Sequence, residues 1–255
     1  MEVLYPRPSS GRPIPLVVFS PGYDIDPGVY GPLVTGWASL GLVVAVPDYP
    51  YTSPGTPGGV DEADIVNHPA DLEATIDDLL AVSGPAAPFS RMIDPARIAV
   101  AGHSDGAVVA DAAVADSCCA DRRIRAAAIL SGSELTSFRG TYGPAPVPLL
   151  VIQGDTDTIN PPACSEQIYG TGGTPRFYLD LRGAGHLPPY TADPSAAVYQ
   201  QVVDRVTALF WRTYLEGDTS AGAALRAGTA VGPPATWFAG GSVPQVGSCP
   251  GAPQN

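Results

Sequence analysis

The stretch Ala101-Gly102-His103-Ser104-Asp105-Gly106-Ala107 joins an apolar run that begins at residue 97 to a series of small residues that ends at residue 110. It matches the G-x-S-x-G pattern of a nucleophile elbow, in which a strand turns sharply into a helix and carries a serine on the turn. Glycines suit both flanking positions, because the close neighbours of such a turn leave no room for β-carbons. The pattern predicts that Ser104 projects its hydroxyl into a cleft at the helix N-terminus.

The composition indicates an acidic globular chain of one domain, residues 1–255. It has 255 residues, 45% of them hydrophobic, and a formal net charge of -12, and its basic residues are all arginine. A chain of this length can bury most of its unfolded surface in a single domain. The negative charge argues against nucleic acid and anionic membrane surfaces as partners. No apolar stretch is long enough to span a membrane.

Apolar runs alternate with amphipathic stretches along most of the chain. Strands are expected at 2–5, 16–19, 42–46, 97–101, 124–130, 149–152 and 177–181, and helices at 29–40, around 65–80, and at about 105–116, 162–169 and 195–215. Such alternation predicts an α/β fold with a mostly parallel central sheet flanked by helices. Residues 216–255, rich in Gly, Ala, Pro and Ser, are expected to form a C-terminal extension packed on the body, with Trp237 and Phe238 as an apolar anchor.

Two helical patterns are amphipathic. In the earlier helix the apolar positions are Ile65, Leu72, Ile76, Leu79 and Leu80, and the outer positions are Asp71, Glu73, Asp77 and Asp78. These carboxylates have no histidine beside them, so we interpret them as a solvated helix face and predict no metal site there. In the later helix the apolar face comprises Val198, Val202, Val206, Leu209 and Phe210.

A serine nucleophile needs a base, usually a histidine, and the chain has three histidines. His68 lies next to a proline at the start of the acidic helix, and His103 lies inside the elbow, where its side chain points away from the serine. His186 follows a predicted strand in the flexible sequence Gly183-Ala184-Gly185. We therefore predict that His186 is the base.

The acid that orients the base is expected after strand 149–152, since the chain order in this arrangement is Ser, then Asp or Glu, then His. Asp155 and Asp157 compete for this role. Asp157 fits better, because Gly154, Asp157 and Pro161 form a G-x-x-D-x-x-x-P pattern that is typical of the acid loop. Asp155 is expected to cap the turn through its side chain.

Two backbone N–H groups are expected to bind the developing oxyanion. One belongs to Asp105, directly after the nucleophile, and the other to Tyr23, in the loop Ser20-Pro21-Gly22-Tyr23 after an early strand. The Asp105 carboxylate has two possible roles. It favours the helix N-terminus through the helix dipole, or, if it faces the cleft, it repels anionic substrates.

With these motifs in place, the chain resembles the α/β-hydrolase superfamily of serine esterases over about residues 3 to 215. The Pro21-Gly22-Tyr23 and Asp157-Thr158-Ile159-Asn160-Pro161 stretches resemble the bacterial cutinases and polyester hydrolases, the PET-hydrolase-like group. The stretches 67–71 and 118–123 are more similar to the dienelactone hydrolase, platelet-activating-factor acetylhydrolase and chlorophyllase-like esterases. Many relatives carry His-Gly where this chain has Pro-Gly, and the backbone role of the loop survives that change.

The resemblance implies a carboxylic ester hydrolase that works through an acyl-enzyme on Ser104, without a metal or organic cofactor. It implies a secreted protein, although residues 1–5 carry no signal-peptide pattern, and we expect a monomer. An ester, polymeric or cutin-like, is the expected substrate. A short-chain small-molecule esterase and an acyltransferase with the same triad are the alternatives.

The segment between strands 124–130 and 149–152 is too short to hold a helical cap or lid. An open cleft that admits bulky or chain-like esters is therefore expected. The residues that could line it are Tyr23, which provides an aromatic wall in the polyester-hydrolase group, His103, Phe138 and Tyr142.

Four cysteines, Cys118, Cys119, Cys164 and Cys249, allow three complete disulfide pairings. The adjacent Cys118 and Cys119 are not expected to bridge each other, because the geometry of such a bridge is strained. A disulfide from Cys249 would tie the C-terminal extension to the body. Buried free thiols are the alternative.

Overall fold

The computed structural model describes residues 1–6, 13–82, 92–135, 138–244 and 247–250. Its strands are β1 (Glu2–Leu4), β2 (Ile14–Ser20), β3 (Val43–Val46), β4 (Ile93–His103), β5 (Ile124–Leu130), β6 (Leu149–Gly154), β7 (Arg176–Leu181) and β8 (Ala235–Ala239). Its helices are α1 (Gly31–Ser39), α2 (His68–Ala81), α3 (Asp105–Ala115), α4 (Pro162–Thr171), α5 (Ala197–Glu216) and α6 (Thr219–Ala227). A 3₁₀ turn precedes α1 at Pro27–Tyr30, and another precedes α2 at Glu62–Asn67.

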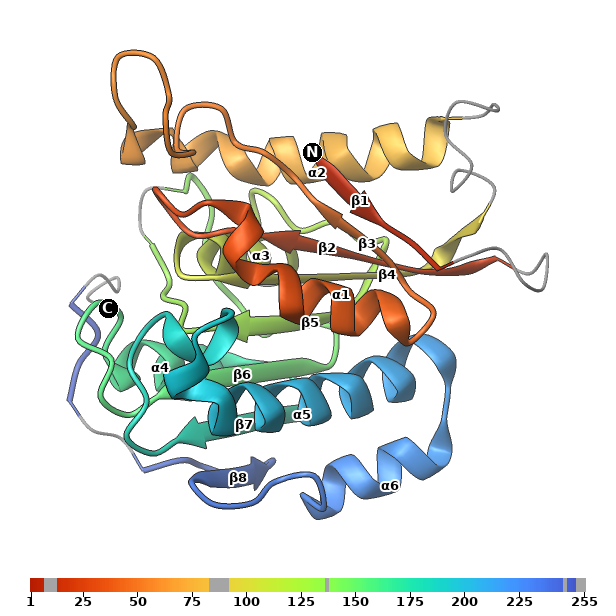
Figure 1. The fold of residues 1–255 in the computed structure, drawn as a ribbon, viewed down its shortest axis with the longest axis vertical. Coiled ribbons are helices and arrows are strands. Elements are labelled where there is room, and N and C mark those ends of the chain that lie inside the picture. The colour runs from red at the N-terminus through yellow and green to blue at the C-terminus, as the bar shows by residue number, and fades with distance from the viewer. Residues whose placement is uncertain (7–12, 83–91, 136–137, 245–246, 251–255) are drawn as a thin grey trace.

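All eight strands belong to one sheet, in the order β1-β3-β2-β4-β5-β6-β7-β8 (Figure 1). The neighbours from β3 to β7 pair in parallel, and β1 and β8 pair antiparallel at the two edges. The expected α/β architecture with a mostly parallel sheet is therefore confirmed. Because parallel neighbours point the same way, the loops after β2, β4, β6 and β7 all leave the sheet at its carboxyl edge.

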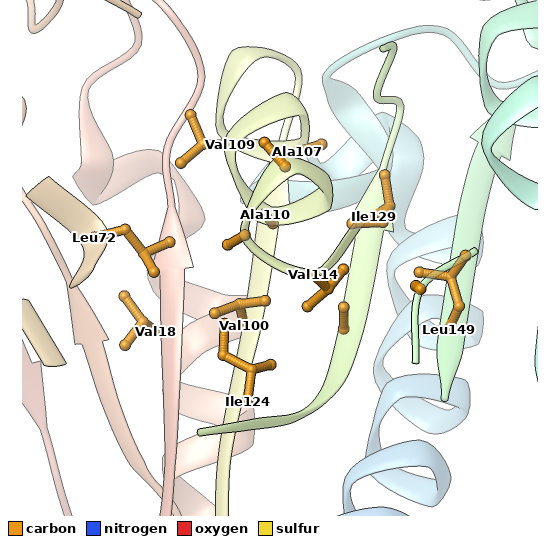
Figure 2. Packing of buried hydrophobic residues seen from close by; sticks show 14 of the residues in the cluster. Val18, Leu72, Val100, Ala107, Val109, Ala110, Val114, Ile124, Ile129 and Leu149 are labelled. Atoms are coloured by element: carbon orange, nitrogen blue, oxygen red, sulfur yellow. The ribbon is translucent and has the colours of Figure 1, made fainter. Parts of the chain in front are cut away.

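The inner strands are apolar on both faces because helices cover both sides of the sheet. In β2, Leu16 and Val18 point into the core under α2, α3 and α4, whereas Val17 and Phe19 point into the core under α1 and α5, with α6 packed against α5. Figure 2 shows the first core, where Val18 and Val100 of the sheet, Leu72 of α2, and Ala110 and Val114 of α3 lie. None of the helices in the described ranges is long and apolar enough to cross a membrane.

Both amphipathic helices are present, with small differences from the expected faces. The four outer carboxylates of α2 are exposed, as predicted. In α5, Val202, Val206 and Phe210 are buried, but Val198 is 46% exposed. Val198, in the first turn of α5, therefore does not belong to the buried face of the helix. Across the interface with α1, the Trp37 indole N–H donates to Thr207 Oγ1 at 2.9 Å, which satisfies a buried donor.

The C-terminal extension contributes two elements that its composition did not predict. After α5, helix α6 packs back on α5, and β8 adds the last strand to the sheet beside β7. Trp237 of β8 stacks on Phe177 of β7, with ring centroids 5.4 Å apart. Further along, Cys249 forms a disulfide with Cys164 of α4. The extension is therefore held to the body by strand pairing, ring stacking and a covalent bond.

The second disulfide joins Cys118 to Cys119, so the expectation that these neighbours do not bridge was wrong. The two residues lie in the turn that follows α3. The Asp116 carbonyl accepts the N–H groups of Cys119 and Ala120, at 3.1 and 3.0 Å, and the Asp116 carboxylate accepts that of Cys118 at 2.8 Å. This turn, closed by three hydrogen bonds to one residue, brings the two side chains together.

The two disulfides close loops of very different length, which predicts different contributions to stability. Replacing Cys164 and Cys249 with serine should lower the free energy of unfolding by about 4 kcal/mol, because a cross-link 85 residues apart in sequence removes much chain entropy from the unfolded state. The matched Cys118→Ser/Cys119→Ser variant should lose far less. Denaturant unfolding of the three proteins measures both effects. Equal losses in the two variants would contradict the loop-length explanation.

Candidate active site

Ser104 lies at the junction of β4 and α3, with backbone angles φ 56° and ψ −123°. This left-handed conformation is strained for a residue other than glycine. Its N–H donates to the carbonyl of Leu130 at the end of β5, at 3.0 Å. A β-carbon at Gly106 would lie 1.9 Å from the Ser20 carbonyl oxygen, and one at Gly102 would lie 2.0 Å from that of Gly106. The steric reason given for the two glycines is therefore confirmed.

His186 and Asp157 meet at the carboxyl edge of the sheet, from the loops after β7 and β6. His186 Nδ1–H donates to Asp157 Oδ2 at 2.7 Å. Asp157 Oδ1 accepts the N–H groups of Ile159 and Asn160, at 2.9 and 3.0 Å, and Gln153 Nε2 donates to Oδ2 at 3.1 Å. Burial alone would raise the pKa of Asp157, but the hydrogen bond from His186 and its charge, with these further donors, hold that pKa below its ordinary value.

Asp155, the competing acid, makes a different contact. Its Oδ1 accepts the N–H of Gly183 at 2.6 Å, so it ties the start of the histidine loop to the acid loop. Thr156 reinforces this link, because its N–H and its hydroxyl both donate to the carbonyl of Ala184, at 3.0 and 2.7 Å. Asp157, rather than Asp155, is therefore the aspartate that contacts His186.

His103, which directly precedes the serine in the chain, contacts His186. The two imidazole centroids are 4.6 Å apart, and His103 Nε2 lies 2.9 Å from the carbonyl oxygen of His186. Among the described residues, no hydrogen bond joins the Ser104 hydroxyl to His186. Bonds of this kind are commonly long in unliganded sites and tighten when substrate binds.

The loop after β2 passes next to the serine. A β-carbon at Gly22 would lie 3.2 Å from Cβ of Ser104. The backbone N–H groups of Tyr23 and Asp105, the two expected oxyanion donors, make no hydrogen bond to any residue that the structure describes. Neither donor is therefore occupied by a partner within the described part of the chain.

The Asp105 carboxyl group lies among the charges of the site. Its Oδ2 is buried and has no hydrogen-bond partner in the described part of the chain. Burial, and in addition the charge of Glu62, raises the pKa of Asp105 to about 6, against an opposing effect of His186. The Asp105 carboxyl group therefore interacts electrostatically with Glu62 and His186, in addition to lying in the first turn of α3.

Three residues expected to line the cleft do not lie there. His103 is completely buried. Phe138 is 5% exposed and belongs to the core that includes α3. Tyr142 pairs through its backbone with Asp116. Asp116 directly follows the last residue of α3, whereas Ser104 directly precedes its first residue. An eleven-residue helix separates these positions by roughly 16 Å along its axis. The pairing with Asp116 therefore places Tyr142 at the far end of α3 from the serine, whereas Phe138 is buried in the core.

Sequence reasoning missed two side chains that support the site, Tyr30 and Gln153, and the neighbouring ring of Tyr190. Tyr30 contacts His103 and the loop after β2, and Tyr190 packs on His103. Gln153 holds the acid loop, because its Nε2 donates to Asp157 and Asn160 and its Oε1 accepts from Ser165. An amide at the carboxyl end of a strand, directly before the acid loop, was a signal for Gln153. The two tyrosines lie far from His103 in the sequence and left no such signal.

One group of potential metal ligands occurs in the described residues, at the other end of α3 from Ser104. One ligand atom each of Asp116, Cys118 and Cys119 lies within 4.8 Å of the others. The two sulfurs are bonded to each other, however, and the thiolate is the form of cysteine that binds metals. The group does not fit a metal ion in this oxidised form.

The close approach of Gly106 to Ser20 predicts an intolerance to the smallest substitution. Gly106→Ala should lower the free energy of unfolding by at least about 3 kcal/mol, because the added carbon would overlap a backbone oxygen that cannot rotate away. Gly36→Ala in α1 is the matched control, since nothing lies within 4 Å of its added carbon. It should stabilise the protein by roughly 0.5 to 1 kcal/mol. Thermal unfolding of both variants tests the contrast, and similar midpoints would contradict it.

The raised pKa of Asp105 predicts a stability that depends on pH. The folded state binds this proton more tightly than the unfolded state, so ionisation costs stability as pH rises from 3.8 through about 6. Asparagine cannot ionise. Asp105→Asn should therefore raise the unfolding midpoint at about pH 8 and leave it nearly unchanged at about pH 4. A gain of the same size at both pH values would show that ionisation of Asp105 is not its source.

The comparisons with known proteins give no further guidance. No protein-family model matches the chain, and no curated protein matches it.

Proposed function

We propose that this protein is a serine carboxylic ester hydrolase of the α/β-hydrolase type, with an open active site. One observation carries the proposal. A serine stands on a left-handed elbow at the end of β4, the ring of the preceding residue packs on His186, and the Nδ1–H of His186 is bound by a buried carboxylate. The parts come from three loops at one edge of a parallel sheet, which is where the sites of such folds form.

Ser104 would begin the reaction by attacking the carbonyl carbon of the ester. His186 Nε2 takes the hydroxyl proton as the bond forms, and Asp157 stabilises the resulting imidazolium through Nδ1–H. The N–H groups of Tyr23 and Asp105 bind the oxyanion of the tetrahedral intermediate. When the intermediate collapses, the carbon–oxygen bond to the alcohol breaks, and His186 gives its proton to the leaving alcohol.

Water then completes the cycle at the acyl-enzyme. His186 removes a proton from the water as it attacks the acyl carbon, and the second tetrahedral intermediate releases the acid when His186 protonates Ser104. Asp157 can support both steps because its lowered pKa keeps it ionised near neutral pH. No step uses a metal or an organic cofactor.

The surroundings of the site support a bulky, chain-like ester as substrate. The described residues between β5 and β6 form no helix, so no helical cap covers the serine from that segment. Ile159, whose N–H holds Asp157, is 67% exposed, and Tyr23 is half-buried, so apolar surface borders the triad. We propose polyesters or cutin-like esters on this basis, acted on by a secreted enzyme. The two disulfides are compatible with an oxidising compartment.

Product release from a soluble short-chain aryl ester and from an amorphous polyester film tests the proposal. Both activities are expected in the wild type, and Ser104→Ala should lower the turnover of the soluble ester by roughly 10⁵-fold, because the nucleophile is lost. Hydrolysis of the soluble ester alone would restrict the substrate to small esters. An added alcohol that gives transfer product faster than water gives acid would identify an acyltransferase. A wild type without activity and without reaction with a fluorophosphonate would contradict a serine hydrolase.

A further inference from the structure

His103, the residue before the nucleophile, is completely buried among three rings. The centroid of its imidazole lies 4.6 Å from that of His186, 4.9 Å from that of Tyr190 and 5.7 Å from that of Tyr30. A packing role alone would be filled by a phenyl ring of similar size. His103 instead uses both of its nitrogen atoms, and each one contacts a different loop.

The direction of every hydrogen bond through His103 can be assigned. The carbonyl of His186 only accepts, so the proton lies on His103 Nε2, 2.9 Å from that oxygen. Burial, and in addition the charge of His186, lowers the pKa of His103 to about 3, so the ring is neutral and Nδ1 carries no proton. Nδ1 therefore accepts from the Tyr30 hydroxyl at 2.8 Å.

The hydrogen-bonded chain continues from Tyr30 to the loop after β2. Having donated its proton to His103, the Tyr30 oxygen accepts the backbone N–H of Gly22, at 3.3 Å. Burial raises the pKa of Tyr30 above its ordinary value, so the hydroxyl keeps the proton that it donates. The chain thus runs from Gly22 N–H to Tyr30, from Tyr30 to His103, and from His103 to the carbonyl of His186.

This chain of hydrogen bonds joins groups whose relative positions matter for the proposed reaction. Gly22 directly precedes Tyr23, whose N–H is the proposed oxyanion donor, and His186 is the proposed base. His103 is bonded covalently to Ser104, so the link between the two loops passes through the neighbour of the nucleophile. Displacements of about 1 Å at such groups can slow a reaction by about 100-fold.

We propose that His103 is a positioning residue that, together with Tyr30, fixes the loop of the oxyanion donor at Tyr23 relative to the loop of the base at His186. This proposal rests on the proposed esterase function. His103 does not contact the substrate, because it is buried, and it exchanges no proton in the reaction. Its two nitrogen atoms set the distance between a donor and a base that come from strands β2 and β7.

The test removes the link to Gly22 without disturbing the bond between His103 and His186. Tyr30→Phe deletes one hydroxyl and keeps the ring. We expect kcat for a soluble aryl ester to fall at least 10-fold with KM within about twofold, because the transition state is misaligned while the ground state is still bound. Affinity for an aryl boronic acid, which forms a tetrahedral anionic adduct on serine, should fall by a similar factor.

Tyr190→Phe is the matched control. Tyr190 is also buried and also packs on His103, and its hydroxyl bonds to Ser131 and to the carbonyl of Ile152 rather than to Gly22 or His103. Both variants lose one buried hydroxyl, so both should lose stability, and only Tyr30→Phe should lose kcat. Equal kcat in the two variants would show that Tyr30 and His103 serve stability alone.

A double-variant cycle tests whether Tyr30 and His103 act as one unit. His103→Gln should lower kcat as well, and combining it with Tyr30→Phe should reduce kcat no further than the more damaging single change. If the fold-losses in kcat of the two single variants multiplied in the double variant, the two residues would act independently, which would contradict a continuous chain of hydrogen bonds.

Labelling of wild-type Ser104 by a fluorophosphonate distinguishes a failure of the esterase function from a failure of the positioning role. An unlabelled wild type contradicts the esterase function and the positioning with it, whereas a labelled wild type with a fully active Tyr30→Phe variant contradicts the positioning alone.

Discussion

The close contact between the first turn of α3 and the end of β2 is the constraint on which the structure depends. At Gly106 two backbones approach so closely that only a hydrogen atom fits between them. This contact sets α3 directly against the sheet, and it explains why eight of the eleven residues of that helix are alanine or valine. Ser104 adopts its left-handed conformation between β4 and α3, whose positions this contact restricts. The strain at the serine is therefore supported by the apolar core into which α3 packs (Figure 2).

In the polar part of the site, the carboxylate of Asp157 has all of its hydrogen-bonding positions filled. Each oxygen of Asp157 accepts two donors, and these donors come from a strand end, two backbone positions and the imidazole. A buried carboxylate needs such partners to remain charged, so the same bonds that hold the acid loop also hold the ionisation state that a triad requires. Asp105 shows the opposite case. One of its oxygens is buried without a partner, and the pKa of that carboxyl group is raised.

Local patterns were enough to predict the parts of the molecule that local physics decides. Continuous apolar runs marked the buried strands, and glycine spacing marked the elbow. The chain order of motifs selected Asp157 and His186. Elements that depend on distant partners were missed. The residues of β8 become a strand only because β7 offers a free edge, and their Gly- and Pro-rich surroundings resemble a loop. Cys118 and Cys119 bridge because a turn around Asp116 brings them together, and Phe138 is buried by residues far away in the sequence.

The bridge between Cys164 and Cys249 encloses the last part of the fold in a covalent ring. This ring contains β7, α5, α6 and β8, the edge of the sheet that includes the loop of His186 (Figure 1). A protease that cuts the backbone once between these cysteines does not divide the molecule into separate pieces, because the fragments stay linked through sulfur. The base would then remain tethered to the half that carries the nucleophile and the acid, so a nicked molecule keeps all three together until the bridge is reduced.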